Sequence, residues 1–193
     1  MQISPEEARW RKAERSRLLE LRAAIPAEER VRHARAIAEA LDQMLTQAGE
    51  IVSVYWPIRA EPDLREWMRA VHARGVRIAL PVAVALGQPL TFREWHPGGR
   101  MERGLWKIPF PADGAQVVPT TVLAPVVGFD SGCYRLGYGG GFFDRTLAGY
   151  ARKPRVVGVG YPQLRIDGFR PQTHDIPMDF ILPGLEPPQK RAG

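Results

Sequence analysis

The chain has 193 residues, 45% of them hydrophobic, which fits one globular domain that buries about 70% of its unfolded surface. No apolar run is long enough to cross a membrane, and the first fifteen residues lack the apolar stretch of a signal peptide, so we expect a cytoplasmic protein with no membrane partner. Cys133 is the only cysteine, which excludes an internal disulfide and a zinc site made of cysteines. No activating histidine accompanies it in a recognisable motif, and we interpret Cys133 as incidental.

The net charge is +6, which makes a polyanionic partner one hypothesis. However, the basic residues are spread along the whole chain, and no run of them is interleaved with stacking aromatic residues. Most of them are arginines, whose forked donors bind phosphate and carboxylate groups well. This pattern favours a small anionic ligand over nucleic acid, and an RNA-binding domain rests on net charge alone.

Two helices are predicted at the start of the chain. Residues 4–7 (SPEE) place Ser4 as a cap and Glu7 three residues later, which is typical of a helix start, and the helix is expected to end near Ala24. A second amphipathic helix follows the break at residues 25–26. Its predicted apolar face consists of Val31, Ala34, Ala38, Leu41 and Leu45.

A strand, a helix and a second strand follow, at residues 51–55, 63–74 and 76–82. This order predicts a parallel pair of strands joined by a right-handed crossover. Residues 90–95 (LTFREW) are predicted to form a strand nearer an edge of the sheet. Residues 122–127 (VLAPVV) are predicted to form a central strand, despite the proline at position 125.

The remainder of the chain continues the alternation. A helix is predicted over residues 142–151, a strand over 155–161 and a short strand over 179–182. Residues 1–185 are expected to form a single domain, and the tail at 186–193 is expected to be disordered.

The order of these elements predicts an α/β fold: a single three-layer domain with a mostly parallel central sheet flanked by helices. In such folds, ligands bind at the carboxyl ends of the strands, where loops lead into helices. The segment RLGYGGGFFDRTLAGY, residues 135–150, occupies such a place.

Four glycines within five residues are the main feature of this segment. Glycines adopt positive φ angles and present backbone N–H groups without side chains in the way, which makes an anion-binding loop. The following helix would add its free N–H groups and the positive end of its dipole, and Arg135 would add a cation. The four residues are Gly137, Gly139, Gly140 and Gly141. A flexible turn with no ligand is the alternative interpretation.

The spacing excludes two familiar glycine motifs. A dinucleotide fingerprint needs a glycine at position 142, where the chain has Phe142, and no Gly-Lys-Ser/Thr sequence of a Walker A loop is present. Phosphate binding by a different loop is the remaining hypothesis.

Acidic residues near this loop are candidates for a magnesium site. Asp144 lies in the first turn of the predicted helix, where it either compensates the helix dipole or binds Mg²⁺. Asp175 and Asp179 lie in a late loop, and either of them could complete the metal site or cap a turn.

Residues 128–148 (GFDSGCYRLGYGGGFFDRTLA) contain Phe-Asp, a short turn, Arg-Leu-Gly-x-Gly-x-Gly, two aromatics and an aspartate. Together with an early arginine-rich helix, the WPIRAEPD segment at 56–63 and HDIPMD at 174–179, this motif resembles the 5-formyltetrahydrofolate cyclo-ligase family, also called methenyltetrahydrofolate synthetase. The order and spacing of these segments cover nearly the whole chain.

The resemblance implies an enzyme that uses ATP and Mg²⁺ to convert 5-formyltetrahydrofolate into 5,10-methenyltetrahydrofolate, ADP and phosphate. This chemistry depends on placement and charge neutralisation more than on a protein nucleophile, which agrees with a sequence that offers no catalytic triad. Arg135 and Asp144 are the implied catalytic residues, and the implied metal ligands are Asp144 and Asp175. The implied ATP-binding residues are Arg11, Arg15, Arg135, Leu136, Gly137, Tyr138, Gly139, Gly140, Gly141, Phe142 and Phe143.

The implied folate-binding residues are Trp56, Glu61, Trp106, Tyr138, Gly139, Gly140, Gly141 and Phe142. Glu61 matches the acid that would accept hydrogen bonds from the amide and amino edge of the pterin, and the tryptophans suit stacking on flat rings. The chain departs from the family at Arg11, where lysine is usual, and at Phe142 and Phe143, where tyrosines are frequent. These departures leave open a divergent member that binds folate or nucleotide without turnover. We expect a monomer or a weak homo-oligomer acting on a small molecule.

Overall fold

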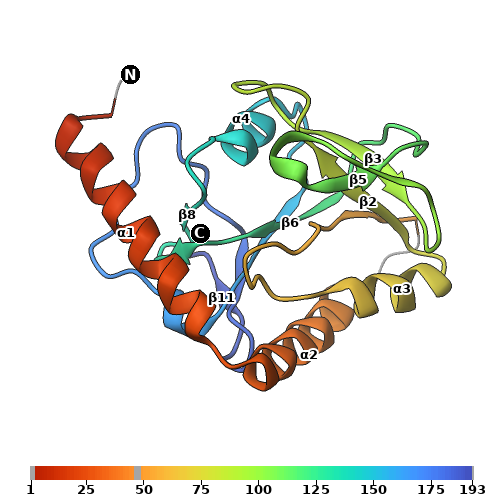
Figure 1. Ribbon diagram of the computed structural model, residues 1–193, viewed down its shortest axis with the longest axis horizontal. Coiled ribbons are helices and arrows are strands. Elements are labelled where there is room, and N and C mark those ends of the chain that lie inside the picture. The colour runs from red at the N-terminus through yellow and green to blue at the C-terminus, as the bar shows by residue number, and fades with distance from the viewer. Residues whose placement is uncertain (1–2, 46–48, 193) are drawn as a thin grey trace.

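The computed structural model describes residues 3–45 and 49–192. Figure 1 shows its helices and strands: two helices come first, and the strands that follow are interrupted by α3 and α4. The α-helices are α1 (Pro5–Ala24), α2 (Ala27–Met44), α3 (Arg65–Ala73) and α4 (Phe142–Ala148). The short 3-10 helices are η1 (Leu105–Lys107) and η2 (Pro162–Leu164).

The main sheet has the strand order β11-β10-β9-β6-β1-β2-β3. Its strands are β1 (Ile51–Ser53), β2 (Arg77–Val82), β3 (Thr91–Trp95), β6 (Thr121–Pro125), β9 (Arg155–Val159), β10 (Phe180–Leu182) and β11 (Gln189–Lys190). The five strands from β10 to β2 run parallel, and the edge strands β3 and β11 run antiparallel to their neighbours. The predicted α/β class with a mostly parallel sheet is therefore confirmed.

Two small antiparallel sheets accompany the main sheet. They consist of β4 (Met101–Arg103) with β5 (Pro109–Pro111), and of β7 (Gly128–Phe129) with β8 (Arg135–Leu136). Neither pair was predicted, because two or three paired residues give no readable alternation of polar and apolar side chains. The hairpin of β7 and β8 leads directly into the glycine loop.

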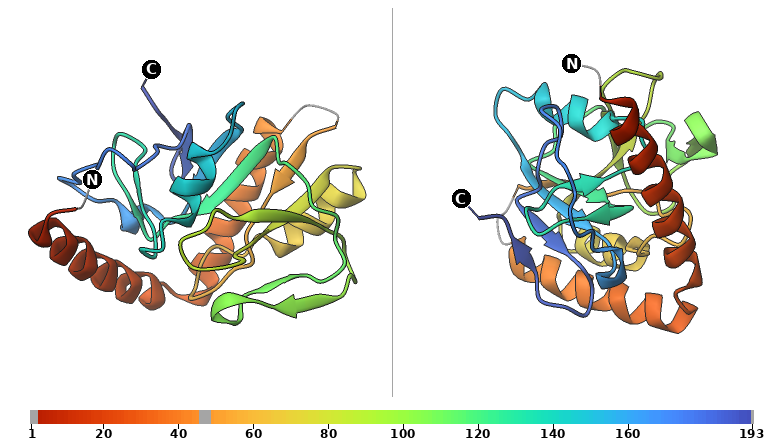
Figure 2. Two further views of the ribbon diagram at one scale, coloured as in Figure 1. Left: turned by 90° about the horizontal axis from the view of Figure 1, so that it is seen from above. Right: turned by 90° about the vertical axis from the view of Figure 1, so that its left-hand side faces the viewer.

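The helices cover the two faces of the sheet, which makes three layers (Figures 1 and 2). On one face, Ile37 and Leu41 of α2 and Met68 of α3 pack against residues of the central strands, including Leu123. On the other face, α1 and α4 pack against the sheet, and Leu18 is buried completely there. Burying apolar side chains on both faces explains why the parallel strands are almost continuously apolar.

The N-terminal helices agree with their predicted limits, and the buried face of α2 differs. Ser4 caps α1, since its hydroxyl accepts a 3.1 Å hydrogen bond from the N–H of Glu7. In α2, His33 and Ile37 are buried with Leu41, whereas Val31 is 52% exposed. The apolar positions alone misplaced this face, because a histidine supplies part of it.

The C-terminal tail corrects another expectation. Residues 189–190 form β11, and Ile181 of β10 pairs with Gln189. The side chain of Gln189 also donates hydrogen bonds to the carbonyls of Asp130 (2.8 Å) and Ser131 (3.1 Å). The prediction of disorder at 186–193 was therefore wrong for this segment, because a glutamine in a polar tail formed contacts that composition does not reveal.

The sheet has a topological switch point between β1 and β6. From β1 the chain continues to β2 on one side, whereas from β6 it continues to β9 and β10 on the other side. Loops that leave the carboxyl ends of β1 and β6 therefore diverge, and such a place is where ligands bind in open α/β sheets. None of the helices in the described residues is long and apolar enough to span a membrane.

Candidate functional site

A cavity of about 750 Å³ lies at the carboxyl ends of β1, β2 and β6. Its wall is completed by α1, the hairpin of β4 and β5, and the glycine loop between β8 and α4. The cavity brings together all of the residues that the family resemblance assigned to ATP, folate or metal. They are Arg11, Arg15, Trp56, Glu61, Trp106, Arg135, Leu136, Gly137, Tyr138, Gly139, Gly140, Gly141, Phe142, Phe143, Asp144 and Asp175.

The glycine loop uses its glycines in different ways. Gly139 and Gly141 have φ angles of 93° and 63°, and Gly141 caps the start of α4. Gly137 and Gly140 do not have positive φ. A Cβ atom on Gly140 would lie 2.7 Å from the ring of Phe142, so close packing, not a special φ angle, requires glycine there. The loop therefore presents bare backbone, although only two of the four glycines adopt the conformation that was expected.

Arg15 of α1 lies against this loop. Its Nε donates a 2.7 Å hydrogen bond to the carbonyl of Gly137, and its guanidinium lies 3.3 Å from the place of a Cβ atom on Gly139. The two terminal nitrogens of Arg15 have no acceptor within the described part of the chain. Burial, followed by the nearby charge of Arg11, lowers the pKa of Arg15. A phosphate group would supply both the acceptors and the negative charge that Arg15 lacks.

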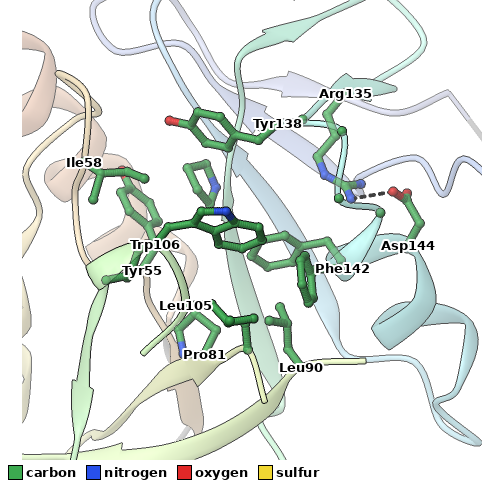
Figure 3. A pocket seen from close by; sticks show the side chains of 18 of the residues that line it. Tyr55, Ile58, Pro81, Leu90, Leu105, Trp106, Arg135, Tyr138, Phe142 and Asp144 are labelled. Atoms are coloured by element: carbon green, nitrogen blue, oxygen red, sulfur yellow. Dashed lines mark hydrogen bonds and ion pairs between the residues drawn. The ribbon is translucent and has the colours of Figure 1, made fainter. Parts of the chain in front are cut away.

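Arg135 and Asp144 form a second charged element at the same end of the cavity (Figure 3). The Arg135 guanidinium donates to Asp144 Oδ2 at 3.0 Å, and the N–H of Ile176 donates to Asp144 Oδ1 at 3.2 Å. Arg135 is buried, which lowers its pKa, while the charge of Asp144 acts in the opposite direction. The pair is held in place from two sides before any ligand arrives.

Arg11 is bound to the protein by all of its nitrogens. It donates to Glu7 at 2.8 Å, to both carboxylate oxygens of Asp175 at 3.2 and 2.6 Å, and to the carbonyl of Arg170 at 2.9 Å. Burial lowers the pKa of Arg11, but the hydrogen bonds to Asp175 and Glu7 outweigh that and raise it overall. Arg11 therefore fixes Asp175, and it has fewer donors free for a ligand than Arg15.

The geometry distinguishes the two late aspartates. Asp175 lines the cavity, whereas Asp179 accepts a 2.7 Å hydrogen bond from the N–H of Val156, at the start of β9 and so at the opposite end of the sheet. No cluster of three or more metal-binding side chains exists in residues 3–45 and 49–192. Asp144 and Asp175 still suit Mg²⁺, because an ion held mainly by phosphate oxygens takes only one or two protein carboxylates.

Glu61 lies at the other end of the cavity and is 5% exposed. Its Oε1 accepts a 2.7 Å hydrogen bond from the Tyr138 hydroxyl, and its Oε2 accepts a 2.9 Å bond from the N–H of Ile58. Burial raises the pKa of Glu61, and the charge of Arg22 opposes this effect. Each oxygen keeps a lone pair for a further donor, so Glu61 is arranged as a double acceptor.

Aromatic side chains form the walls between the two ends. Trp106 is 61% exposed, has a φ angle of 54°, and meets Phe142 edge to face with ring centres 5.4 Å apart. In Figure 3, Trp106 lies between Tyr55 on one side and Phe142 on the other. Trp56 follows β1 and carries the guanidinium of Arg65 over its ring at 5.4 Å. Such walls suit flat ring systems.

Several residues of the cavity were missed by the sequence reasoning. They are Tyr55, Ile58, Arg59, Pro81, Leu90 and Leu105. Tyr55 and Pro81 lie at or just after the ends of parallel strands, so the rule that ligands bind at the carboxyl ends of strands was a usable signal for them. Arg22, which bonds to Tyr138 from α1, was also missed.

Known proteins are similar to this chain in sequence. A family model described as the 5-formyltetrahydrofolate cyclo-ligase family matches residues 7–184. A curated protein of Mycolicibacterium smegmatis named 5-formyltetrahydrofolate cyclo-ligase is 30% identical over 87% of this chain and 90% of its own length. The protein of that name from Escherichia coli K12 is 29% identical over 68% of this chain and 76% of its own.

Solved structures are similar as well. The NMR structure of Aquifex aeolicus 5,10-methenyltetrahydrofolate synthetase has a TM-score of 0.80 at 25% identity and covers 95% of this chain and 94% of its own. The Mycoplasma pneumoniae 5,10-methenyltetrahydrofolate synthetase shares the fold, with a TM-score of 0.73 at 22% identity over 89% of this chain and 97% of its own. The chain therefore belongs to the 5-formyltetrahydrofolate cyclo-ligase family and is an enzyme of that family.

Proposed function

We propose that the chain uses ATP and Mg²⁺ to cyclise 5-formyltetrahydrofolate to 5,10-methenyltetrahydrofolate, with release of ADP and phosphate. The proposal rests on one observation about the cavity. At one end, the guanidinium of Arg15 lies beside the bare backbone of the glycine loop, and at the other end the buried carboxylate of Glu61 can accept hydrogen bonds at both oxygens. Two different substrates, one a polyanion and one with a donor edge, would fit these ends side by side.

The glycine loop is proposed to bind the ATP phosphates. Arg15 supports this role because its terminal nitrogens have no acceptor in the part of the chain that the structure describes, and Arg135 supplies a second positive charge close to the start of α4. The seven-residue helix α4 is short, so the loop and the arginines would supply most of the attraction.

Asp144 and Asp175 are proposed to hold Mg²⁺ together with phosphate oxygens. A bound Mg²⁺ neutralises charge on the phosphates and makes the terminal phosphorus easier to attack. Asp144 would exchange part of its contact with Arg135 for the metal, and Arg135 would then be free to turn toward the phosphate. Asp175 would stay fixed by Arg11 through its second oxygen.

Glu61 is proposed to accept hydrogen bonds from the amide and amino edge of the pterin, with Trp56 and Trp106 beside the ring system. The formyl oxygen then attacks the γ-phosphorus as the bond to ADP breaks. Nitrogen 10 next attacks the formyl carbon and loses its proton, and the C–O bond breaks to release phosphate. No protein nucleophile takes part, and the residues of the cavity position the substrates and neutralise charge.

The test mixes the purified protein with 5-formyltetrahydrofolate, ATP and Mg²⁺ and follows the absorbance of the methenyl product. We expect product only when all three are present, and we expect Glu61→Gln to raise KM for the folate while KM for ATP stays unchanged. Absence of product at generous enzyme concentration contradicts the proposal.

A second candidate function is binding of folate or nucleotide without turnover. The hydrogen bonds of Arg11 favour it, because the residue that usually is a lysine in the family is here engaged with Glu7, Asp175 and Arg170. Calorimetric binding of both ligands with no product would identify this case.

We propose further that the enzyme acts in the cytoplasm as a monomer or weak homo-oligomer, without a nucleic-acid or membrane partner. Sedimentation equilibrium would measure the oligomeric state. Salt-dependent affinity for RNA in the absence of ATP binding would instead support an RNA-binding domain.

A further inference from the structure

Arg22 of α1 is completely buried and lies outside the wall of the cavity. Its guanidinium makes no ion pair with a carboxylate in the described residues, although a buried charge without compensation is costly. Arg22 instead donates to the carbonyl of Arg59 at 2.9 Å, to the carbonyl of Val126 at 3.2 Å, and to the hydroxyl of Tyr138. These partners belong to the loops after β1 and β6 and to the glycine loop, so one cation joins three segments of the site.

The hydrogen bonds around Arg22 have a fixed direction. A guanidinium only donates, so the Tyr138 hydroxyl must accept from Arg22 and its single proton is left for Glu61. That proton points to Glu61 Oε1 at 2.7 Å, and the N–H of Ile58 points to Oε2 at 2.9 Å. Both carboxylate oxygens are therefore acceptors, which is the pattern of an ionised carboxylate.

The charges around Glu61 favour the same state. The groups that interact with it are Arg22 from α1, Arg59 from its own loop, Tyr55 from the end of β1, Tyr138 from the glycine loop and Tyr161 from the segment after β9, while Asp63 acts on Tyr55 and Tyr161. Only Arg22 and Arg59 are positive, and Arg59 is exposed and screened by solvent. The buried charge of Arg22 is thus the main opponent of the desolvation of Glu61.

We propose that Arg22 is a positioning residue which, through the Tyr138 hydroxyl, keeps Glu61 ionised and oriented as an acceptor for the amide and amino edge of the reduced pterin. The identity of that ligand rests on the proposed function. The arrangement itself follows from the contacts of Arg22, Tyr138 and Glu61, and it is tested separately below.

The first measurement is a pH titration of Glu61 in the free protein. Carbon-13 NMR of protein labelled at the glutamate carboxyl carbon reports each ionisation, and Glu61→Gln identifies the signal of Glu61. Three variants separate the contributions: Arg22→Gln keeps hydrogen-bond donors without the charge, Arg22→Lys keeps the charge without the fork, and Tyr138→Phe removes the bridging hydroxyl.

We expect Arg22→Gln to raise the pKa of Glu61 by about one unit, because a buried opposite charge is lost. Tyr138→Phe raises it as well, since a hydrogen bond to the ionised form disappears, and Arg22→Lys leaves it near the wild-type value. In steady-state kinetics, the acid limb of the KM profile for the folate moves to higher pH in Arg22→Gln. The result is a rise in KM of up to about tenfold below that limb, with a much smaller change in kcat.

Wild-type pKa values of Glu61 in both Arg22→Gln and Tyr138→Phe, in proteins that melt cooperatively, would overturn the inference. If Arg22→Gln does not fold, Tyr138→Phe and Arg22→Lys test the inference without it. An unchanged pKa of Glu61 in Tyr138→Phe is incompatible with the Glu61 relay, by which we mean the hydrogen bonds from Arg22 to the Tyr138 hydroxyl and from that hydroxyl to Glu61. A wild-type protein that makes no methenyl product contradicts the proposed function, whereas the NMR titration still tests the link between Arg22 and Glu61.

Discussion

The two ends of the cavity differ in how their positive and negative side chains are paired. At the glycine-loop end, Arg135 and Asp144 form a direct ion pair, and the two terminal nitrogens of Arg15 have no acceptor among residues 3–45 and 49–192. At the Glu61 end, the buried cation Arg22 and the buried carboxylate do not touch, and the hydroxyl of Tyr138 lies between them. Tyr138 belongs to the glycine loop, so this loop contributes to both ends.

The two ends would therefore respond differently to a ligand. A direct ion pair exchanges partners when a metal ion and phosphate arrive, so the glycine-loop end is suited to charge that changes during the reaction. At the Glu61 end, each nitrogen of Arg22 and the Tyr138 hydroxyl already donate a hydrogen bond to the protein, so this end is suited to holding a neutral ring edge in a fixed orientation. Substitutions at the first end should affect kcat and ATP, and those at the second end should affect the folate.

The largest effect is expected from Asp144→Asn. This change removes a proposed metal ligand and leaves the buried charge of Arg135 without its counter-charge, so we expect kcat to fall by roughly 10³-fold or more. The folate affinity, measured by calorimetry without ATP, should stay within about twofold because Asp144 does not contact the Glu61 relay. Kinetics and calorimetry on the same preparation check both statements.

A matched control is Asp113→Asn, which removes an exposed carboxylate that also pairs with an arginine, Arg100, at 2.8 Å. Its kcat should equal that of the wild type. A near-normal kcat in Asp144→Asn would contradict a role of this ion pair in the reaction, because the pair at the glycine-loop end would then be structural only.

Arg15→Met should have the next largest effect. Removing this cation, which is proposed to bind the phosphates, should raise KM for ATP roughly 10- to 100-fold, since charge-assisted hydrogen bonds to phosphate are among the strong ones. KM for the folate should change little. Arg17→Gln is the control, because Arg17 lies on the same helix, pairs with Glu14 and is 57% exposed. Equal losses of ATP and folate affinity in Arg15→Met would mean that the two ends are not separate.

The two ends also differ in how well the sequence predicted them. Gly139, Arg135 and Asp144 lie within ten residues of each other, so their association was visible as one short motif. Arg22, Glu61 and Tyr138 come from three distant segments, and the Arg22 to Tyr138 contact spans 116 positions. No local pattern reports such a contact, so the family resemblance supplied Glu61 and nothing supplied Arg22.

The parts of the fold that the sequence predicted correctly are also those that depend on local patterns. The limits of α1 and the central position of β6 follow from caps and apolar runs, which act over a few residues. The buried face of α2 did not follow, because His33 is buried by accepting a 3.1 Å hydrogen bond from the N–H of Leu185, far along the chain. Helix caps and apolar runs act locally and predicted their elements, whereas the buried face of α2 depends on a long-range contact that the sequence does not reveal.

The variants Gly139→Ala and Gly137→Ala test whether the conformation of Gly139 and its contact with Arg15 set the affinity for ATP. Gly139 has a φ angle of 93°, and a Cβ atom there would lie 3.3 Å from the Arg15 guanidinium, whereas a Cβ atom on Gly137 meets nothing within 4 Å. We expect Gly139→Ala to raise KM for ATP about tenfold, through about 1–2 kcal/mol of backbone strain and a displaced Arg15. Gly137→Ala should change it less than about twofold. Equal effects of the two substitutions would show that the loop, and not its contact with Arg15, sets the affinity.

The smallest effect concerns an ion pair outside both ends, which serves as a reference for them. Asp42 of α2 accepts from Trp67 of α3 at 2.9 Å and pairs with Arg74, and no residue of α2 or α3 lines the cavity. The hydrogen bond from Arg74 lowers the pKa of Asp42, with a further contribution from Trp67.

Because the pKa of Asp42 is lower in the folded state, its contribution to stability is present above the unfolded pKa, about 3.9, and disappears as the pH falls through the folded value. Asp42→Asn should therefore lower Tm by roughly 1–3 °C at pH 7, with a difference that shrinks as the pH falls below the unfolded pKa and vanishes below the folded one. Thermal melts across this range measure it, and kcat and both KM values should match the wild type. Any change in KM would mean that the α2 face communicates with the cavity, and the contrast between the two ends would then extend across the sheet.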